Sequence, residues 1–249
     1  MAEPMLELVG LCKRFGALVV TDDVSLRVAP HRVHAVIGPN GAGKTTLIQQ
    51  VFGILRPDSG LVRLAGRDIT GLAPHRRARL GLARVFQITS VLPEFSAFEN
   101  VALAVQARDG SVFSMVRPAA GDIRANAAAM AILRRLGLEA RHGVMAGTLS
   151  HGEKRQLELA MALASRPRVM LLDEPLAGAG PEETVRLVSL LSGLREECAI
   201  LLVEHDMDAV FRLADEITVL AQGRVIAHGT PAEIRADGAV RAAYLGEDF

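Results

Sequence analysis

The 249-residue chain has few lysines, only two cysteines and no surplus of charge of either sign. Lys+Arg and Asp+Glu number 28 each, so the formal net charge is zero. A bulk attraction to nucleic acid or anionic lipid needs a positive excess, and the whole-chain balance supplies none. We therefore expect no nucleic-acid partner.

The two cysteines, Cys12 and Cys198, lie far apart and form no CxxC pair. This excludes a disulfide framework and gives no sign of a zinc site. The mean hydropathy of +0.27 is high, yet no run reaches the roughly 20 nearly uncharged residues of a membrane span. The start, residues 1–4, lacks the basic and apolar stretches of a signal peptide. We expect a cytosolic protein with reduced thiols.

Lysine is scarce, since only Lys13, Lys44 and Lys154 are found among the 28 basic residues. Arginine carries nearly all the positive charge. A position that keeps lysine therefore calls for a specific explanation, such as a site that suits a compact point charge better than a planar guanidinium.

The length allows one large domain or one domain with an inserted lobe. We expect a single domain over residues 1–249 with an α/β fold. Alternating segments at 6–11, 24–28 and 61–64 predict an antiparallel sheet edge, an N-terminal β subdomain. A mainly parallel sheet is predicted from strands and helices at 33–37, 45–52, 169–172, 182–194, 198–203, 207–213 and 217–220. A hairpin turning at 221–223 follows. Between about 90 and 166, helical spacing predicts an inserted helical subdomain.

Residues 38–45, Gly-Pro-Asn-Gly-Ala-Gly-Lys-Thr, fit the pattern G-x-x-x-x-G-K-[ST] between a predicted strand and helix. The glycines let backbone N–H groups wrap a phosphate, and the helix N-terminus adds partial positive charge. Lys44 suits the β- and γ-phosphate oxygens, and the Thr45 hydroxyl suits Mg²⁺. The alternative is a glycine-rich turn without a ligand. The motif predicts nucleotide binding by Gly38, Pro39, Asn40, Gly41, Ala42, Gly43, Lys44, Thr45 and Thr46.

Residues 169–174, Val-Met-Leu-Leu-Asp-Glu, form an apolar strand that ends in two carboxylates. At the carboxyl edge of a parallel sheet both side chains can approach a ligand beside the phosphate loop. Asp173 is expected to hold Mg²⁺, and Glu174 to orient or deprotonate an attacking water. Taken alone, such a pair is more often a solvated strand end. Behind a phosphate loop the functional interpretation is favoured.

The next strand ends in the same way, in Glu-His-Asp at 204–206. Beside a nucleotide, His205 offers an imidazole at the distance of the terminal phosphate. An isolated histidine there is ordinarily just a strand-end residue. Gln87 suggests nothing by itself.

Five motifs in order resemble the nucleotide-binding domain of ATP-binding cassette (ABC) transporters, over essentially the whole chain. They are the phosphate loop, Gln87, Leu-Ser-His-Gly-Glu at 149–153, Leu-Leu-Asp-Glu-Pro at 171–175 and His205. The resemblance implies a P-loop NTPase core that hydrolyses ATP with Mg²⁺. It also implies that Gln87 senses Mg²⁺ and the membrane subunit, that His205 contacts the γ-phosphate and that Phe15 stacks on adenine. Phe15 is equally compatible with simple packing.

Residues 149–153 look like the signature motif of that family, placed before a predicted helix over 154–163. Ser150, Gly152 and Glu153 would present a helix N-terminus to the γ-phosphate bound by the opposite subunit. The resemblance therefore implies an ATP-sandwich dimer, homomeric or with a second, related ATPase.

Closer resemblance is to the ATPases of branched-chain (hydrophobic) amino acid importers. It is carried by the segments 95–101, 149–153, 173–178, 203–208 and 223–227. It implies an ATPase subunit that powers uptake of branched-chain or other amino acids or small amides. The implied partners are transmembrane permease subunits and, indirectly, a periplasmic solute-binding protein. The implied location is peripheral, on the cytoplasmic face of the inner cell membrane.

The chain departs from the family pattern at three places. His151 replaces the usual first glycine of the signature, Glu153 replaces glutamine, and residues 177–180 lack an aspartate that couples two nucleotide sites in many ABC proteins. The last departure predicts weaker or differently connected communication between sites.

Two other classes remain as alternatives. A soluble ABC-type ATPase acting on nucleic acid would usually carry a coiled coil, tandem cassettes or basic extensions, which this sequence does not show. A small-molecule kinase would share the phosphate loop but has no reason to carry the signature. The basic cluster His75, Arg76, Arg77, Arg79 and Arg84 is expected to be a solvated helix face rather than a lipid or nucleic-acid site.

Overall fold

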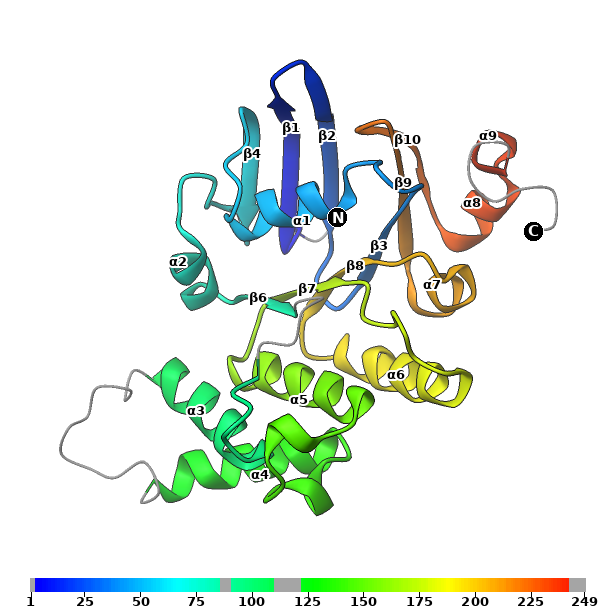
Figure 1. Cartoon of the computed structure of the whole chain (residues 1–249). Coiled ribbons are helices and arrows are strands. Elements are labelled where there is room, and N and C mark those ends of the chain that lie inside the picture. The colour runs from blue at the N-terminus through cyan, green and yellow to red at the C-terminus, as the bar shows by residue number, and fades with distance from the viewer. Residues whose placement is uncertain (1–2, 86–90, 110–121, 242–249) are drawn as a thin grey trace. The chain divides into compact units, whose positions relative to one another are not determined.

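The computed structural model describes residues 3–85, 91–109 and 122–241 (Figure 1). The chain divides into two compact units, Met1–Arg84 with Arg168–Phe249, and Val85–Pro167. We call them the sheet unit and the helical unit. The helical unit is thus an insertion between two segments that fold together.

The sheet unit contains a four-stranded antiparallel sheet in the order β2-β1-β4-β5. Its strands are β1 (Leu6–Phe15), β2 (Leu18–Val28), β4 (Ser59–Leu64) and β5 (Arg67–Asp68). Leu6 pairs with Val28 and Leu64, and all three are buried. Since strand side chains alternate between faces, the apolar residues at every second position make one face of this sheet part of the core.

A second sheet has six strands in the order β10-β9-β3-β8-β7-β6. They are β3 (Val33–Ile37), β6 (Leu82–Val85), β7 (Val169–Asp173), β8 (Ala199–Val203), β9 (Glu216–Ala221) and β10 (Arg224–Gly229). β3 runs parallel to β8 and β9, β7 runs parallel to β8, and β10 pairs antiparallel with β9. Every residue of β3, β7 and β8 is buried, as expected for parallel strands covered on both faces.

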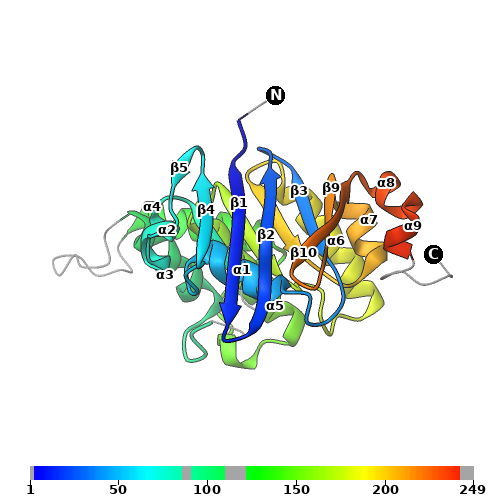
Figure 2. The same cartoon turned by 90° about the horizontal axis from the view of Figure 1, so that it is seen from above.

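Helix α1 (Lys44–Phe52) lies between the two sheets. Its Leu47, Ile48 and Val51 share one core with apolar residues of β1, β2 and β4 and of β3, β7 and β8. Figures 1 and 2 both show α1 against β1 and β2. The helix that follows the phosphate loop is therefore held by packing on both sides.

Ala35 and Ile37 of β3 pack in a second cluster with β9, α7 and α8. The remaining helices of the sheet unit are α2 (Pro74–Arg79), α6 (Pro181–Leu194), α7 (Met207–Leu213), α8 (Pro231–Ala236) and α9 (Gly238–Val240). α6 buries Leu187, Leu191 and Leu194, which are spaced for one helix face. In the described part of the chain no helix is both long and apolar enough to cross a bilayer.

The helical unit consists of α3 (Ala97–Asp109), α4 (Ile123–Arg135) and α5 (His151–Ala164), with short 3₁₀ turns at Glu139–Arg141 and Ala146–Thr148. α3 packs against both α4 and α5. Asp122 caps α4 by accepting hydrogen bonds from the backbone N–H groups of Arg124 and Ala125.

The predicted fold class is confirmed: an α/β core with a mainly parallel sheet, an antiparallel β part and a helical insertion. Some bounds differ. β1 and β2 extend to Phe15 and Leu18, beyond the predicted segments, because register shifts interrupt the alternation there. They belong to the separate four-stranded antiparallel sheet, as expected for the N-terminal β subdomain. α5 starts three residues before the predicted 154, because its cap is Ser150.

The prediction of a solvated basic face is wrong for two of its five residues. Arg77 is buried and donates to the carbonyl oxygens of Leu72, Gln50, Val51 and Thr70 at 2.6–2.9 Å. Burial lowers its pKa to about 10. Arg84 lies on β6, with little exposed side chain. The spacing of residues on a short helix cannot predict that one arginine points inward and donates to backbone carbonyl oxygens.

Candidate functional site

The phosphate loop joins β3 to α1 as predicted, and its residues differ in exposure. Pro39, Asn40, Gly41 and Thr45 are exposed, Thr46 is half-buried, and Gly38, Ala42 and Gly43 are buried. The N-cap of α1, Gly43, has no side chain, and the first turn carries no acidic residue. No side chain therefore accepts hydrogen bonds from the N–H groups at the start of α1, and these groups can bind an anion.

The packing of the fold requires glycine at two positions of the loop. A Cβ on Gly38 would lie 1.9 Å from the backbone oxygen of Leu220, and one on Gly43 would lie 2.3 Å from that of Val20. A Cβ on Gly41 would meet no atom within 4 Å. Of these three glycines, only Gly41 opens toward empty space.

Lys44 is buried at the start of α1 and is held by the loop itself. Its Nζ donates to the carbonyl oxygens of Gly38 at 2.6 Å and Pro39 at 3.0 Å. Burial lowers the pKa of Lys44, and the carboxylates of Glu174 and Asp173 oppose this effect. The lysine cation thus lies near both strand-end carboxylates, inside a loop shaped for phosphate.

Asp173, the last residue of β7, is buried and paired with Arg84 of β6. The guanidinium NH2 of Arg84 lies 3.1 Å from Oδ2 of Asp173. Burial raises the pKa of Asp173, although Arg84 acts in the opposite direction. Sequence reasoning did not assign Arg84 to the site, because only the sheet order brings β6 beside β7.

Glu174 has a left-handed backbone conformation, with φ of 50°. Its N–H donates to the carbonyl of Val203 at 2.8 Å, which ties the end of β7 to β8. His205, after β8, is largely exposed, and its Nδ1 lies 4.0 Å from Oε1 of Glu174. The structure therefore brings together Glu174 and His205, and both follow strands that run parallel to each other.

Glu204 is a residue of this edge that sequence reasoning missed. Its carboxylate is fully buried and accepts hydrogen bonds from the N–H groups of Leu176 at 2.7 Å and His205 at 3.0 Å. Burial raises its pKa, and the backbone donors oppose this. The available signal was its position directly after a wholly apolar strand, as for Asp173 and Glu174.

Phe15 ends β1 at the β1–β2 hairpin and is 51% exposed, so it is not part of the core. Nζ of Lys13 lies 5.7 Å from the centre of its ring. Lys13 also pairs with Asp58 at 2.6 Å, and Asp58 accepts from the N–H of Arg14. The exposed Phe15 ring, which is the candidate partner for an adenine base, thus lies at the end of the hairpin. Asp58 holds this end through its contacts with Lys13 and Arg14.

The signature segment begins helix α5 in the helical unit. Ser150 and Glu153 form a capping box: Oγ of Ser150 accepts from the N–H of Glu153, and the Glu153 carboxylate accepts from the N–H of Ser150. Nε of Arg141 lies 2.6 Å from Glu153. Arg141 and the Ser150 N–H hold the pKa of Glu153 at about 2. Gly152 lies in the first turn, and a side-chain hydrogen bond from Ser150 also helps to lower the pKa of Glu153.

Gln87, predicted as a catalytic and metal-sensing residue, lies outside the described residues. Thr45 and Asp173 provide hard oxygen donors of the kind Mg²⁺ prefers. In the described ranges no three His, Cys, Asp or Glu residues form a metal-binding group. Mg²⁺ does not require one, because it usually takes one or two protein ligands and keeps phosphate oxygens and water.

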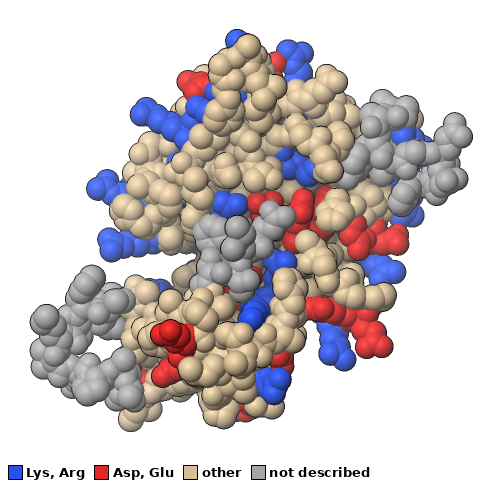
Figure 3. Space-filling model, viewed as in Figure 1, with Lys and Arg blue, Asp and Glu red and all other residues tan. Residues whose placement is uncertain are grey.

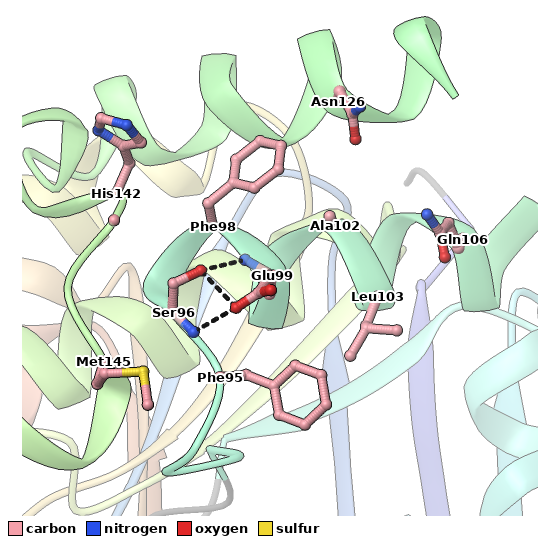
Figure 4. A pocket seen from close by; sticks show the side chains of 11 residues that line it. Phe95, Ser96, Phe98, Glu99, Ala102, Leu103, Gln106, Asn126, His142 and Met145 are labelled. Atoms are coloured by element: carbon pink, nitrogen blue, oxygen red, sulfur yellow. Dashed lines mark hydrogen bonds between the residues drawn. The ribbon is translucent and has the colours of Figure 1, made fainter. Parts of the chain in front are cut away.

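A cavity of about 660 Å³ opens in the helical unit (Figure 4). Its apolar lining includes Phe95, Phe98, Leu103 and Met145, and Phe98 is directed toward α4. The carboxylate of Glu99 accepts from the N–H and hydroxyl of Ser96 at its edge. The cavity is large enough for several side chains of a partner.

Charged residues of both signs are interspersed on the face shown in Figure 3. This distribution agrees with the formal net charge of zero. Recognition on this face therefore depends on local contacts rather than on a broad field of one sign.

The sequence profile of the ABC transporter family matches residues 21–177, and that of the branched-chain amino acid ATP-binding cassette transporters matches residues 224–249. The chain belongs to the ABC transporter family and has its ATP-binding cassette. It is 41% identical to the high-affinity branched-chain amino acid transport ATP-binding protein BraF of Pseudomonas aeruginosa, over 99% of this chain and 100% of that protein. It is 37% identical to the high-affinity branched-chain amino acid transport ATP-binding protein LivG of Escherichia coli K12, over 99% of this chain and 100% of that protein.

A solved structure of similar fold is the ADP conformation of MJ1267, an ATP-binding cassette of an ABC transporter. Its TM-score is 0.85 at 30% sequence identity, covering 98% of this chain and 99% of that one. The predicted resemblance to ABC ATPases, and to those of branched-chain amino acid importers, is therefore confirmed. Nucleotide binding follows from membership of the family.

Proposed function

We propose that this chain is the ATP-hydrolysing subunit of an ABC importer for branched-chain or other amino acids or small amides. BraF and LivG, whose names state branched-chain amino acid transport, match it over nearly full length. The proposal places the chain on the cytoplasmic face of the cell membrane as a peripheral subunit. Its partners are permease subunits and, through them, a periplasmic solute-binding protein.

One observation carries the proposal: the phosphate loop and the candidate hydrolytic residues follow the ends of neighbouring parallel strands. Lys44 follows β3, Glu174 follows β7 and His205 follows β8, in a sheet ordered β3-β8-β7. Ligands of open α/β sheets bind outside the carboxyl ends of such strands. A nucleotide whose phosphates lie on the loop would have its terminal phosphate beside these side chains.

Mg²⁺, held by Thr45 and Asp173 with the phosphates, would neutralise charge that develops on the γ-phosphoryl group. The chain's own groups do the rest. The loop N–H groups and Lys44 bind the β- and γ-phosphates, and Arg84 keeps the buried Asp173 carboxylate in place. Gln87 contacts this site in the proposal, as the family resemblance implies.

In hydrolysis, the water oxygen bonds to the γ-phosphorus while the bond from phosphorus to the β–γ bridging oxygen breaks. Glu174 accepts the water proton, and that proton passes on to the released inorganic phosphate; ADP leaves with the bridging oxygen. His205 stabilises the γ-phosphate and helps to orient the water. Phe15 stacks on the adenine.

Two ATPase subunits complete each site in this proposal. Ser150, Gly152 and the N-terminus of α5 bind the γ-phosphate held by the opposite subunit, which is this chain or a related ATPase. ATP therefore closes the dimer and hydrolysis reopens it, because ATP and ADP differ in their contacts with the opposite subunit. Permease subunits receive the motion through the segment after Gln87 and the helical unit.

The test is co-purification with the permease subunits, followed by measurement of solute-stimulated ATPase activity. Stimulation by a branched-chain amino acid through the binding protein is expected, and Lys44→Ala, the control, should remove it. Activity stimulated by DNA without the permease subunits would instead support a soluble ATPase acting on nucleic acid.

A further inference from the structure

Glu204 joins the two loops that carry the candidate hydrolytic residues. One carboxylate oxygen, Oε1, accepts from the N–H of Leu176 in the segment between β7 and α6. The other, Oε2, accepts from the N–H of His205 between β8 and α7, with a longer contact of 3.5 Å to the N–H of Asp206. A single side chain therefore spans both loops.

The two anchor points lie close to the hydrolytic residues in sequence and space. Leu176 is two residues after Glu174, and His205 is itself an anchor point. Nδ1 of His205 lies 3.8 Å from Oε2 of Glu204 and 4.0 Å from Oε1 of Glu174. The Glu204 carboxylate therefore lies beside His205 and binds the segment two residues after Glu174.

Packing alone does not explain a carboxylate at this place. The side chain is 0% exposed, whereas the five residues of β8 before it are apolar. Burying a carboxylate is costly unless its oxygens accept hydrogen bonds. Here they accept from two different loops, and an apolar side chain would leave the N–H of buried Leu176 without this partner.

We propose that Glu204 is a positioning residue for ATP hydrolysis, because it fixes the loop after Glu174 to the loop that carries His205. The inference rests on the proposed function and deepens it. Glu204 does not touch the nucleotide. It sets the distance and direction at which Glu174 and His205 meet the attacking water.

The first test is Glu204→Gln in the full chain. Glutamine keeps the size, but its NH₂ group can accept from neither loop, so one of the two loop attachments is lost. We expect kcat for ATP hydrolysis to fall by about 10- to 100-fold, since misplacement by about 1 Å can cost 10²-fold. KM for ATP and the Kd for a non-hydrolysable ATP analogue should stay within about twofold, because the Glu204 carboxylate accepts its hydrogen bonds from Leu176, His205 and Asp206, which lie outside the phosphate loop.

Asp215→Asn is a matched control at the opposite edge of the same sheet. Asp215 lies directly before β9, and its carboxylate accepts the backbone N–H of Val33, the first residue of β3, at 2.8 Å. The control should lower the unfolding temperature and leave kcat per nucleotide-binding site unchanged. A merely structural role for Glu204 would produce that same pattern and would overturn the inference.

A double-mutant cycle with His205→Ala gives the second readout. If Glu204 acts through His205 and Glu174, Glu204→Gln should lower kcat much less in the His205→Ala background than in the wild type. Effects that multiply would contradict the inference. If Glu204→Gln fails to fold, Glu204→Asp takes its place: it keeps the charge but shortens the reach, and the same fall in kcat at constant KM is expected.

The proposed function fails separately. If the wild-type chain with its permease subunits hydrolyses no ATP, the proposed function is wrong whatever the variants do. If the wild type hydrolyses ATP and a folded Glu204→Gln variant keeps its kcat, only the role of Glu204 is wrong.

Discussion

The imidazole Nδ1 of His205 and the carboxylate Oε1 of Glu174 lie 4.0 Å apart at the ends of two parallel strands. That spacing is too long for a direct hydrogen bond. The left-handed backbone of Glu174 directs its side chain away from the regular course of the strand. Strained conformations of this kind concentrate at functional sites.

Replacing Glu174 with glutamine should therefore separate binding from hydrolysis. The phosphate loop is unchanged, so ATP affinity should persist, but an amide cannot accept the proton of water. We expect a loss of turnover of at least about 10²-fold and an ATP-dependent dimer that persists. Steady-state ATPase assays and size-exclusion chromatography with ATP measure both effects. Unchanged ATPase activity would show that Glu174 is not the catalytic base.

Gly38→Ala and Gly41→Ala should destabilise the fold to very different extents. The new Cβ at Gly38 meets the backbone oxygen of Leu220 at 1.9 Å, so the end of β3 and β9 must separate. At Gly41 there is open space, and the cost is the left-handed backbone alone, about 1–2 kcal/mol. Thermal unfolding without nucleotide should show a much larger loss for Gly38→Ala. Equal losses would contradict the packing role of Gly38.

Glu153→Gln should strengthen ATP-driven dimerisation. The variant keeps an acceptor for the N–H of Ser150 and removes one negative charge from the N-terminus of α5. A charge at a helix end is worth about 0.3–1 kcal/mol, which predicts dimerisation tighter by about two- to fivefold per site. Sedimentation with ATP in the Glu174→Gln background measures this. Glu139→Gln, at a carboxylate paired with Arg134 in the same unit, is the control. Weaker dimerisation would show that Glu153 itself supports the interface.

His34 should make the fold sensitive to mild acid. It is buried on β3, with Nε2 2.8 Å from Oγ1 of Thr218 and its ring stacked on that of His228. Burial, followed by the charge of His228, lowers the pKa of His34 from 6.5 to about 4. As pH falls below 6.5 the unfolded chain takes up the proton first, so stability is lost progressively down to about pH 4.

This loss amounts to about 3 kcal/mol, at about 1.4 kcal/mol per pKa unit. Urea denaturation of the wild type and of His34→Leu between pH 7 and pH 4.5 measures it. The variant should lose less stability over this range. Parallel curves for the two proteins would mean that His34 does not carry the acid sensitivity.

The lysines illustrate which contacts can be predicted from the sequence. Lys44 was expected from its motif, and its Nζ donates to the carbonyl oxygens of Gly38 and Pro39 inside the same loop. Lys13 had no explanation in the sequence, because its partner Asp58 is 45 residues away and is brought near by the pairing of β1 with β4. Motifs predict contacts within one loop, whereas pairs between strands depend on register.

Buried charge was the main feature that sequence patterns did not predict. Arg84, Arg77 and Glu204 each look like ordinary polar residues at the end of an element or on a helix. Their roles depend on which carboxylate or carbonyl lies opposite, and sheet order decides that. Apolar periodicity predicts which faces of an element are buried. It does not predict which hydrogen-bond partners a buried polar side chain will have.

Arg77 gives α1 a counter-charge at its far end. Its guanidinium binds the carbonyl oxygens of Gln50 and Val51, which lie in the last turn of the helix that starts at Lys44. The partial negative charge of that terminus is balanced before any ligand arrives. A phosphate at the other terminus therefore completes a helix that is already anchored. The free energy of nucleotide binding is then not consumed in ordering α1, and under the proposed function it can drive closure of the dimer.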